Sequence, residues 1–149
     1  MDNTRLIVYK TLLSFEKKKR EIKYILNKEL KNNDLRNKDL RLITEIVNGA
    51  TRQRMNLDWK IQTFFKGNFN KIDIELLVLL RMGAYQIFFC KNIPDYAAVN
   101  SSVEISKGIK KRFVSPCNAI LRNLIRNKNK FQIKSSNLSD ICNFYSHPK

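Results

Sequence analysis

The stretch IELLVLLRMGAYQIFF, residues 74–89, is apolar on almost every side when it is drawn as a helix. Its apolar residues recur with the 3.6-residue period of an α-helix at Leu76, Leu77, Leu80, Ala84, Ile87 and Phe88. A helix that is apolar all round is normally buried, so this stretch is predicted to be the central helix of the fold. Asp73 is a residue type that caps helix N-termini, and Asn92 and Pro94 should end the helix.

The same period predicts helices on both sides of this stretch, whereas the two-residue period of a strand is scarce. Before it, helices are predicted at 6–13, at 22–30, from Leu40 to about Met55, and at 57–65. After it, one helix runs from about Asp95 to Lys107 and another covers 115–126. The predicted fold is therefore all-α, a compact bundle of about seven helices with a short C-terminal tail.

Several residues mark the expected helix ends. Asn3 or Thr4 should cap the first helix, and Gly108 should end the sixth. Ser115 and Pro116 offer an N-cap and a first-turn proline for the last helix. Two glycines, Gly49 and Gly83, fall inside predicted helices, where glycine costs about 1 kcal/mol relative to alanine. Close approach of neighbouring helices explains that cost, and Tyr85 and Trp59 are expected in the core.

The charge of the chain calls for an anionic partner. Its 149 residues fit one domain, and 29 Lys and Arg against 13 Asp and Glu give a net charge of +16. Nucleic acid is the first candidate partner and an anionic membrane surface the second. A merely basic composition, in keeping with the many Asn, Ile and Lys residues, is the alternative.

The positive charge is concentrated in particular segments. Residues 73–104 hold two basic and four acidic residues, 2 − 4 = −2, whereas residues 105–139 hold nine basic residues and no acid. Another cluster runs from Arg5 to Arg20 and ends in KKKR. The predicted RNA-binding residues are Arg5, Lys10, Arg52, Arg54, Lys110, Lys111, Arg112, Arg122 and Arg126. Six of these residues are expected on one side of the bundle: Arg5, Lys10, Arg52, Arg54, Arg122 and Arg126. For any single basic run, the alternative is a solvated loop.

The sequence offers no metal or catalytic motif. Cys90, Cys117 and Cys142 are widely spaced, and His147 is the only histidine, so neither a zinc site nor a cofactor is expected. An odd number of thiols without a signal peptide fits the cytoplasm. Cys117 lies near a helix start, which can lower a thiol pKa, but no base is near in sequence and a packing role is expected. The apolar run 74–80 is too short to span a membrane. The aromatic residues fall mostly on core-facing positions, whereas a helix that binds a membrane surface needs exposed aromatics, so no membrane partner is expected.

Three segments resemble the NusB-like fold, a small all-α RNA-binding domain. They are IPDYAAVNSSVEISK (93–107), LLRMGAYQIFF (79–89) and NAILRNLIR (118–126), and the resemblance covers roughly residues 3–128. The family has two relevant branches, free-standing transcription antitermination factors and the N-terminal domains of ribosomal RNA 5-methylcytosine methyltransferases. The segment EIVNGATRQRMNLD (45–58), together with AAVN and NAILR, resembles the methyltransferase branch more closely.

The resemblance implies an RNA-binding domain at residues 3–128 and a tail or linker at 129–149 that would lead to a methyltransferase domain. The final residues YSHPK look like the start of that linker. The chain alone is then not expected to be an enzyme, because it lacks a strand, Gly-rich loop and helix unit for the methyl donor. The tail is expected to be loosely ordered or to lie along the bundle through Phe131, Ile133, Leu138 and Phe144. The alternative is an antitermination factor that binds RNA and a ribosomal protein.

Overall fold

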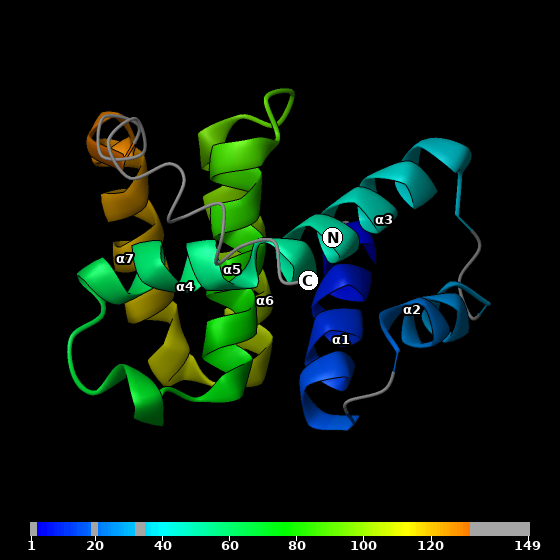
Figure 1. Ribbon diagram of the computed structural model, residues 1–149, viewed down its shortest axis with the longest axis horizontal. Helices are drawn as coiled ribbons and strands as arrows, with labels where there is room; N and C mark the ends of the chain where they lie inside the picture. The colour runs from blue at the N-terminus through cyan, green and yellow to red at the C-terminus, as the bar shows by residue number, and fades with distance from the viewer. Residues whose placement is uncertain (1–2, 19–20, 32–34, 132–149) are drawn as a thin grey trace.

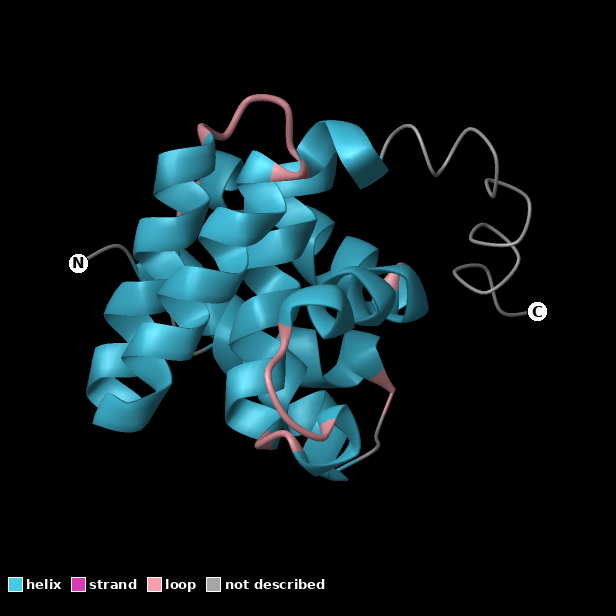
Figure 2. Cartoon of the chain, turned by 90° about the vertical axis from the view of Figure 1, so that its left-hand side faces the viewer, coloured by secondary structure: helices cyan, strands magenta, loops and turns pink. Residues whose placement is uncertain are grey.

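The computed structural model describes residues 3–18, 21–31 and 35–131, and these residues form helices joined by short loops (Figure 1). The α-helices are α1 (Asn3–Lys18), α2 (Ile22–Lys31), α3 (Asn37–Arg52), α4 (Arg54–Phe64), α5 (Ile74–Phe89), α6 (Asp95–Ile109) and α7 (Val114–Arg126). Two short 3-10 helices, η1 (Phe69–Lys71) and η2 (Lys111–Phe113), precede α5 and α7. No strand occurs in these ranges, so the all-α prediction is confirmed (Figure 2).

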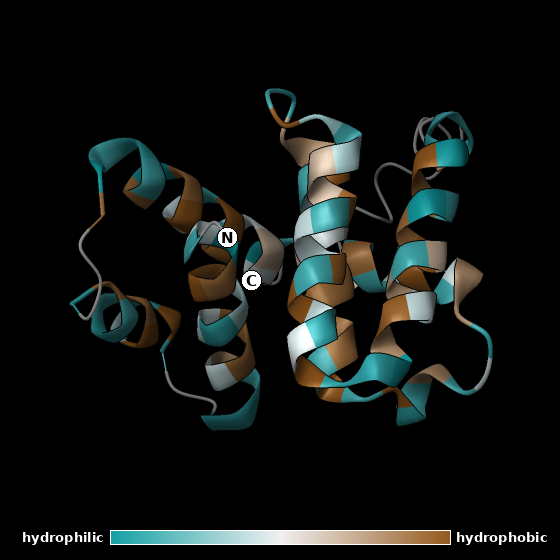
Figure 3. Cartoon of the chain, turned by 180° about the vertical axis from the view of Figure 1, so that it is seen from behind, coloured by the Kyte–Doolittle hydropathy of each residue, from teal (hydrophilic) through white to brown (hydrophobic). Residues whose placement is uncertain are grey.

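Helix α5 lies at the centre of the bundle. It packs against α1, α3, α4, α6 and α7, and its residues 76–87 are all buried. In Figure 1, α1, α2 and α3 lie on one side of α5, and α7 lies on the other side. Helix α6 packs directly on α5, and α4 crosses in front of both. The outer helices carry hydrophilic and apolar residues on different sides (Figure 3), as expected for helices that bury one face. The predicted central position of 74–89 is therefore confirmed.

Several helices begin or end at residues other than those predicted, because the backbone turns there. The third predicted helix divides at Gln53, whose φ of −94° and ψ of 14° end α3, so Met55 belongs to α4. At the other end of the chain, η2 runs directly into α7 with Phe113 at the N-cap position, and Ser115 therefore lies inside the first turn. The prediction that Ser115 caps this helix is wrong, whereas Pro116 does lie in the first turn.

Smaller differences occur at three other helix ends. Asn3 and Thr4 are already the first residues of α1, so neither precedes it as a cap. Asp73 occupies the N-cap position of α5, but its side chain makes no capping hydrogen bond. Gly108 continues α6 to Ile109 instead of ending it, because the backbone N–H of Lys110 still bonds to Ser106 O.

Two glycines allow helices to approach α5 closely, as predicted. A Cβ at Gly49 in α3 would overlap the Tyr85 ring of α5, which lies directly over the glycine backbone. A Cβ at Gly83 in α5 would lie 2.7 Å from Cδ1 of Leu121 in α7. The absence of these side chains therefore sets the contacts of both α3 and α7 with the central helix.

Phe131, which lies in the segment predicted as tail, belongs to the core. It is 4% exposed, and its ring meets Trp59, Phe64 and Phe88 edge-on at centroid distances of 5.5, 6.1 and 5.7 Å. The Lys60 Nζ lies 4.8 Å from the centroid of the Phe88 ring in the same cluster. Phe131 thus holds the described residues after α7, 127–131, against α4 and α5, while Ile133, Leu138 and Phe144 lie outside the described residues.

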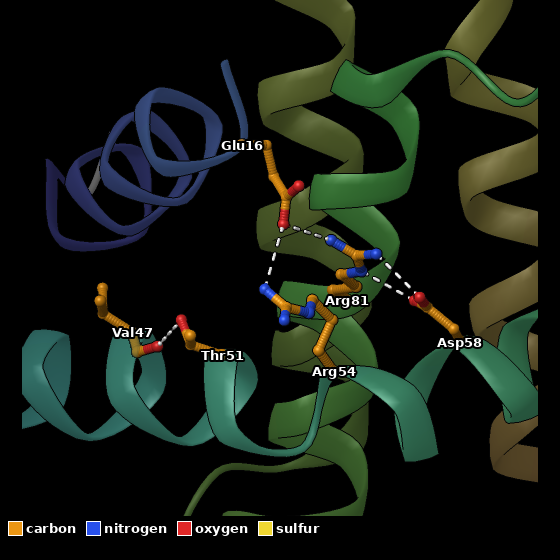
Figure 4. Close-up of polar contacts among 6 residues, drawn as sticks. All are labelled: Glu16, Val47, Thr51, Arg54, Asp58 and Arg81. Atoms are coloured by element: carbon orange, nitrogen blue, oxygen red, sulfur yellow. Dashed lines mark hydrogen bonds and ion pairs between the residues drawn. The ribbon is translucent and has the colours of Figure 1, made fainter. Parts of the chain in front are cut away.

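Helix α5 carries a buried cation, Arg81, which is 9% exposed (Figure 4). Its Nε and Nη2 donate to the Oδ1 and Oδ2 of Asp58 at 2.7 and 2.8 Å, and its Nη1 donates to Glu16 Oε1 at 2.9 Å. Arg54 Nη1 lies 3.8 Å from the same Glu16 oxygen. Burial disfavours the charged guanidinium, but the hydrogen bonds and charges of Asp58 and Glu16 outweigh it and raise the pKa of Arg81.

Replacing Arg81 with Met should destabilise the fold by about 3–5 kcal/mol, because two half-buried carboxylates lose their partner. The measurement is urea unfolding followed by far-ultraviolet circular dichroism. Arg36→Ala is the matched control, since Arg36 pairs with Asp39 at 3.6 Å on the surface and should contribute at most about 1 kcal/mol. Equal effects of the two substitutions would contradict the structural role of Arg81.

Gly49→Ala should lower the free energy of unfolding by about 1–3 kcal/mol, because the added methyl group displaces the Tyr85 ring. Gly108→Ala is the control, because a Cβ there meets nothing within 4 Å and alanine should stabilise α6 by about 0.5–1 kcal/mol. Melting temperatures measured side by side test the pair. The expectation fails if Gly49→Ala melts at or above the wild-type temperature.

Candidate nucleic-acid interface

The predicted RNA-binding residues fall into two groups on different sides of α5. The first group, the α1–α3 group, comprises Arg5 and Lys10 in α1, Arg52 at the end of α3 and Arg54 at the start of α4. The second, the α7 group, comprises Lys110, Lys111 and Arg112 around η2 with Arg122 and Arg126 in α7. Helices α1 and α7 both pack on α5, from different sides in Figure 1. The structure therefore does not bring Arg122 and Arg126 together with the α1–α3 group.

Two members of the α1–α3 group also contact the bundle. Arg5 Nε donates to Gln86 Oε1 at 3.1 Å, and Gln86 is fully buried in α5. Arg54 approaches Glu16 and lies with its Cζ 5.8 Å from the centroid of the Phe15 ring. Lys10 and Arg52 are exposed. This group therefore combines cations that are oriented by the protein with cations that face solvent.

The α7 group forms a strip of exposed cations from η2 to the end of α7, with three members around η2 and two on the helix. Its five members are all exposed, and α7 has 13 residues, which corresponds to a length of about 20 Å. Arg122 Nε donates to Asn118 Oδ1 at 2.9 Å, one turn earlier on the same helix, which orients the guanidinium. Lys130, which the sequence prediction did not include, is exposed just beyond the end of α7. The positive charges of such a strip can bind the phosphates of a nucleic-acid backbone.

One acidic residue approaches the η2 end of the strip. Arg112 Nη2 lies 3.4 Å from Asp73 Oδ2, with the Arg112 side chain 63% exposed. Lys110 and Arg112 both lie over the Phe113 ring, at 5.7 and 5.3 Å from its centroid. Exposed ion pairs of this kind contribute little to stability, so Arg112 can exchange Asp73 for a phosphate at small cost.

The described thiols are not activated nucleophiles. Burial raises the pKa of Cys117 to about 12, although Cys117 lies in the first turn of α7, so the predicted packing role is confirmed. Burial, followed by the hydrogen bond and charge of Glu45, raises the pKa of Cys90 to about 12. Within the described ranges, no three His, Cys, Asp or Glu residues are placed to hold a metal ion. No helix there is long and apolar enough to cross a membrane.

Alkylation should distinguish these thiols from a catalytic cysteine. In a Cys142→Ser variant, iodoacetamide at pH 8 should modify the native protein about 10³-fold more slowly than the unfolded chain, because thiols with a pKa near 12 are almost fully protonated there. The native rate should keep rising between pH 9 and 11, where the unfolded chain levels off. Rapid native labelling of Cys117 at pH 7 would contradict this.

Together the fold and its exposed cations define a small helical domain with a strongly basic surface. The model of the NusB family matches residues 2–126, and the chain belongs to this family. It is a NusB-like RNA-binding domain, as the sequence resemblance implied.

The relatives fall in both branches. The chain is 30% identical over 126 residues to the probable ribosomal RNA small subunit methyltransferase B of Bacillus subtilis, which covers 83% of this chain but only 28% of the relative. It is 31% identical over 107 residues to the transcription antitermination protein NusB of Clostridium novyi, covering 70% of this chain and 80% of that protein. A solved NusB structure from T. maritima superposes with a TM-score of 0.75 over 87% of this chain and 95% of that one, at 23% identity, and it shows the shared fold.

Proposed function

We propose that this chain is the N-terminal RNA-binding part of a ribosomal RNA 5-methylcytosine methyltransferase and contacts ribosomal RNA in the cytoplasm. The observation that carries the proposal is the strip of exposed cations along η2 and α7, in a stretch, residues 105–139, that contains nine basic residues and no acid. The likeness to the Bacillus subtilis protein, confined to 28% of that protein, supports a role as one part of a longer enzyme.

In this proposal the domain binds and the rest of the enzyme catalyses. Lysine and arginine side chains replace counterions on the phosphates, and the release of these ions drives association. Guanidinium groups such as that of Arg122 bind phosphate oxygens in a fork, which adds orientation to attraction. The S-adenosylmethionine site and the reacting cysteine would lie outside this chain, and the domain would present the RNA to them.

The second candidate function is that of a free-standing antitermination factor that binds RNA together with a ribosomal protein. It is favoured by the coverage of the antitermination relatives, since the match extends over 80% of the Clostridium novyi protein and 92% of the Clostridium acetobutylicum protein. RNA binding is common to both functions. They differ in the partner, which is a catalytic domain in the first and a ribosomal protein in the second.

RNA binding should weaken steeply with salt. With about six phosphate contacts, the logarithm of the association constant for a small-subunit ribosomal RNA fragment should fall with log salt at a slope near −4 to −5. The double substitution Arg122→Glu, Arg126→Glu should reduce this slope by about 2 and weaken binding at every salt concentration.

The matched control for this experiment is Lys66→Glu with Lys71→Glu, which makes the same charge change at exposed positions around η1. Melting temperatures of both double variants should stay near that of the wild type. A salt slope near zero, or equal losses of affinity in the two variants, would refute the proposed interface.

The two candidate functions can be separated at the gene. A reading frame that continues beyond Lys149 into a doubly wound domain would establish the methyltransferase role, and the 149-residue chain should then neither bind S-adenosylmethionine nor methylate RNA. A stop codon at that point, with recruitment of the chain to a transcription complex, would establish the antitermination role instead.

A further inference from the structure

Helix α2 leaves an aromatic side chain exposed at the edge of the bundle. It packs on α1 and α3 through Ile25 and Leu26, which are each 5% exposed. Tyr24, their neighbour, is 52% exposed. In Figure 1 α2 lies on the outside of α1, far from α6 and α7. A single exposed aromatic residue is common on protein surfaces, but Tyr24 also lines two surface hollows.

Two surface hollows meet at Tyr24. The larger, between α2 and α3, has a volume of about 730 Å³; Tyr24, Lys28 and Lys31 line it together with the apolar side chains of Leu30, Leu35 and Leu40. The smaller, towards α1, has a volume of about 560 Å³ and is lined by Tyr24, Lys28 and Lys18 among others. Both volumes fall in the range of small-ligand sites. Tyr24 and Lys28 are thus common to both hollows.

The charge around these hollows is positive. Residues 17–18 and 21–31 contain five lysines and two glutamates, 5 − 2 = +3, and the lysines are Lys17, Lys18, Lys23, Lys28 and Lys31. All five lysines are exposed. The surroundings of Tyr24 therefore attract an anion. The Tyr24 ring and the leucines offer an apolar surface to any group that enters the hollow between α2 and α3.

We propose that the hollow between α2 and α3 receives an unpaired RNA base, which stacks on the Tyr24 ring while Lys28 and Lys31 contact the flanking phosphates. The inference rests on the proposed RNA-binding function and adds a second contact, remote from the α7 group. A nucleotide combines a flat π-surface with a phosphate, which matches an aromatic ring, an apolar wall and two cations within one hollow. An acidic peptide would satisfy the lysines but would leave Tyr24 and the leucines without a matching group.

The test compares two RNA probes with the full chain. One is a fluorescent hairpin with an unpaired loop, and the other is the same stem closed into a continuous duplex. Tyr24→Ala should weaken hairpin binding by about 5- to 150-fold, the loss of one stacked base, and should leave duplex binding within twofold. Tyr24→Phe retains the ring and should bind the hairpin like the wild type. Tyr96→Ala is the matched control, because Tyr96 in α6 is 70% exposed and lies outside the hollow.

A second measurement tests the phosphate contacts independently of the ring. Lys28→Gln with Lys31→Gln should reduce the salt slope for the hairpin by about 1.4, the value for two contacts to a single strand. The inference is overturned if Tyr24→Ala binds both probes as the wild type does, if it weakens both equally, or if Tyr24→Phe loses as much as Tyr24→Ala. Displacement of the hairpin by polyglutamate as effectively as by unlabelled RNA would also overturn it. If the wild type binds neither RNA at low salt, the proposed function itself fails.

Discussion

The pairing of Arg81 with Asp58 and Glu16 is the constraint on which the arrangement of the other helices depends. Arg81 is a cation in the middle of a helix that is apolar on almost every side, and a buried charge without partners would cost several kcal/mol. Both oxygens of Asp58 in α4 and one oxygen of Glu16 in α1 face its guanidinium. The charge is satisfied because α1 and α4 meet α5 at the level of Arg81, and an arrangement that moved either helix would separate Arg81 from a carboxylate.

The same network links the core to the surface charge. Glu16 serves both Arg81 and Arg54, so one of the candidate RNA-binding arginines is oriented from inside the bundle. The acidic residues around α5 are largely used in this way: Asp58 and Glu16 bind Arg81, and Glu45 accepts the Cys90 thiol. Much of the negative charge near the centre is therefore neutralised locally. The net charge of +16 is expressed mainly on the outer helices, where a polyanion can reach it.

The helices could be predicted from the sequence because burial of one helix face imposes a 3.6-residue period, and α5 was recognised from the absence of a polar face. The ends of the helices could not be predicted in this way. The turn at Gln53 and the direct entry of η2 into α7 depend on backbone angles, and residue preferences, such as that of Ser115 for an N-cap, do not determine these angles. The lone arginine inside residues 74–89 was a signal for a buried ion pair. Its partners lie 23 and 65 residues away, a separation that periodicity cannot bridge.

The candidate interface was predictable in kind but not in place, and the reason bears on how the domain contacts RNA. Composition identifies the cations, whereas their grouping depends on which helices α5 separates. Because α1 and α7 pack on α5 from different sides, the α1–α3 group and the α7 group face different directions. A short straight duplex that lies on the α7 strip does not also reach the other group. Folded RNA with several helices, such as ribosomal RNA, can engage both groups at once.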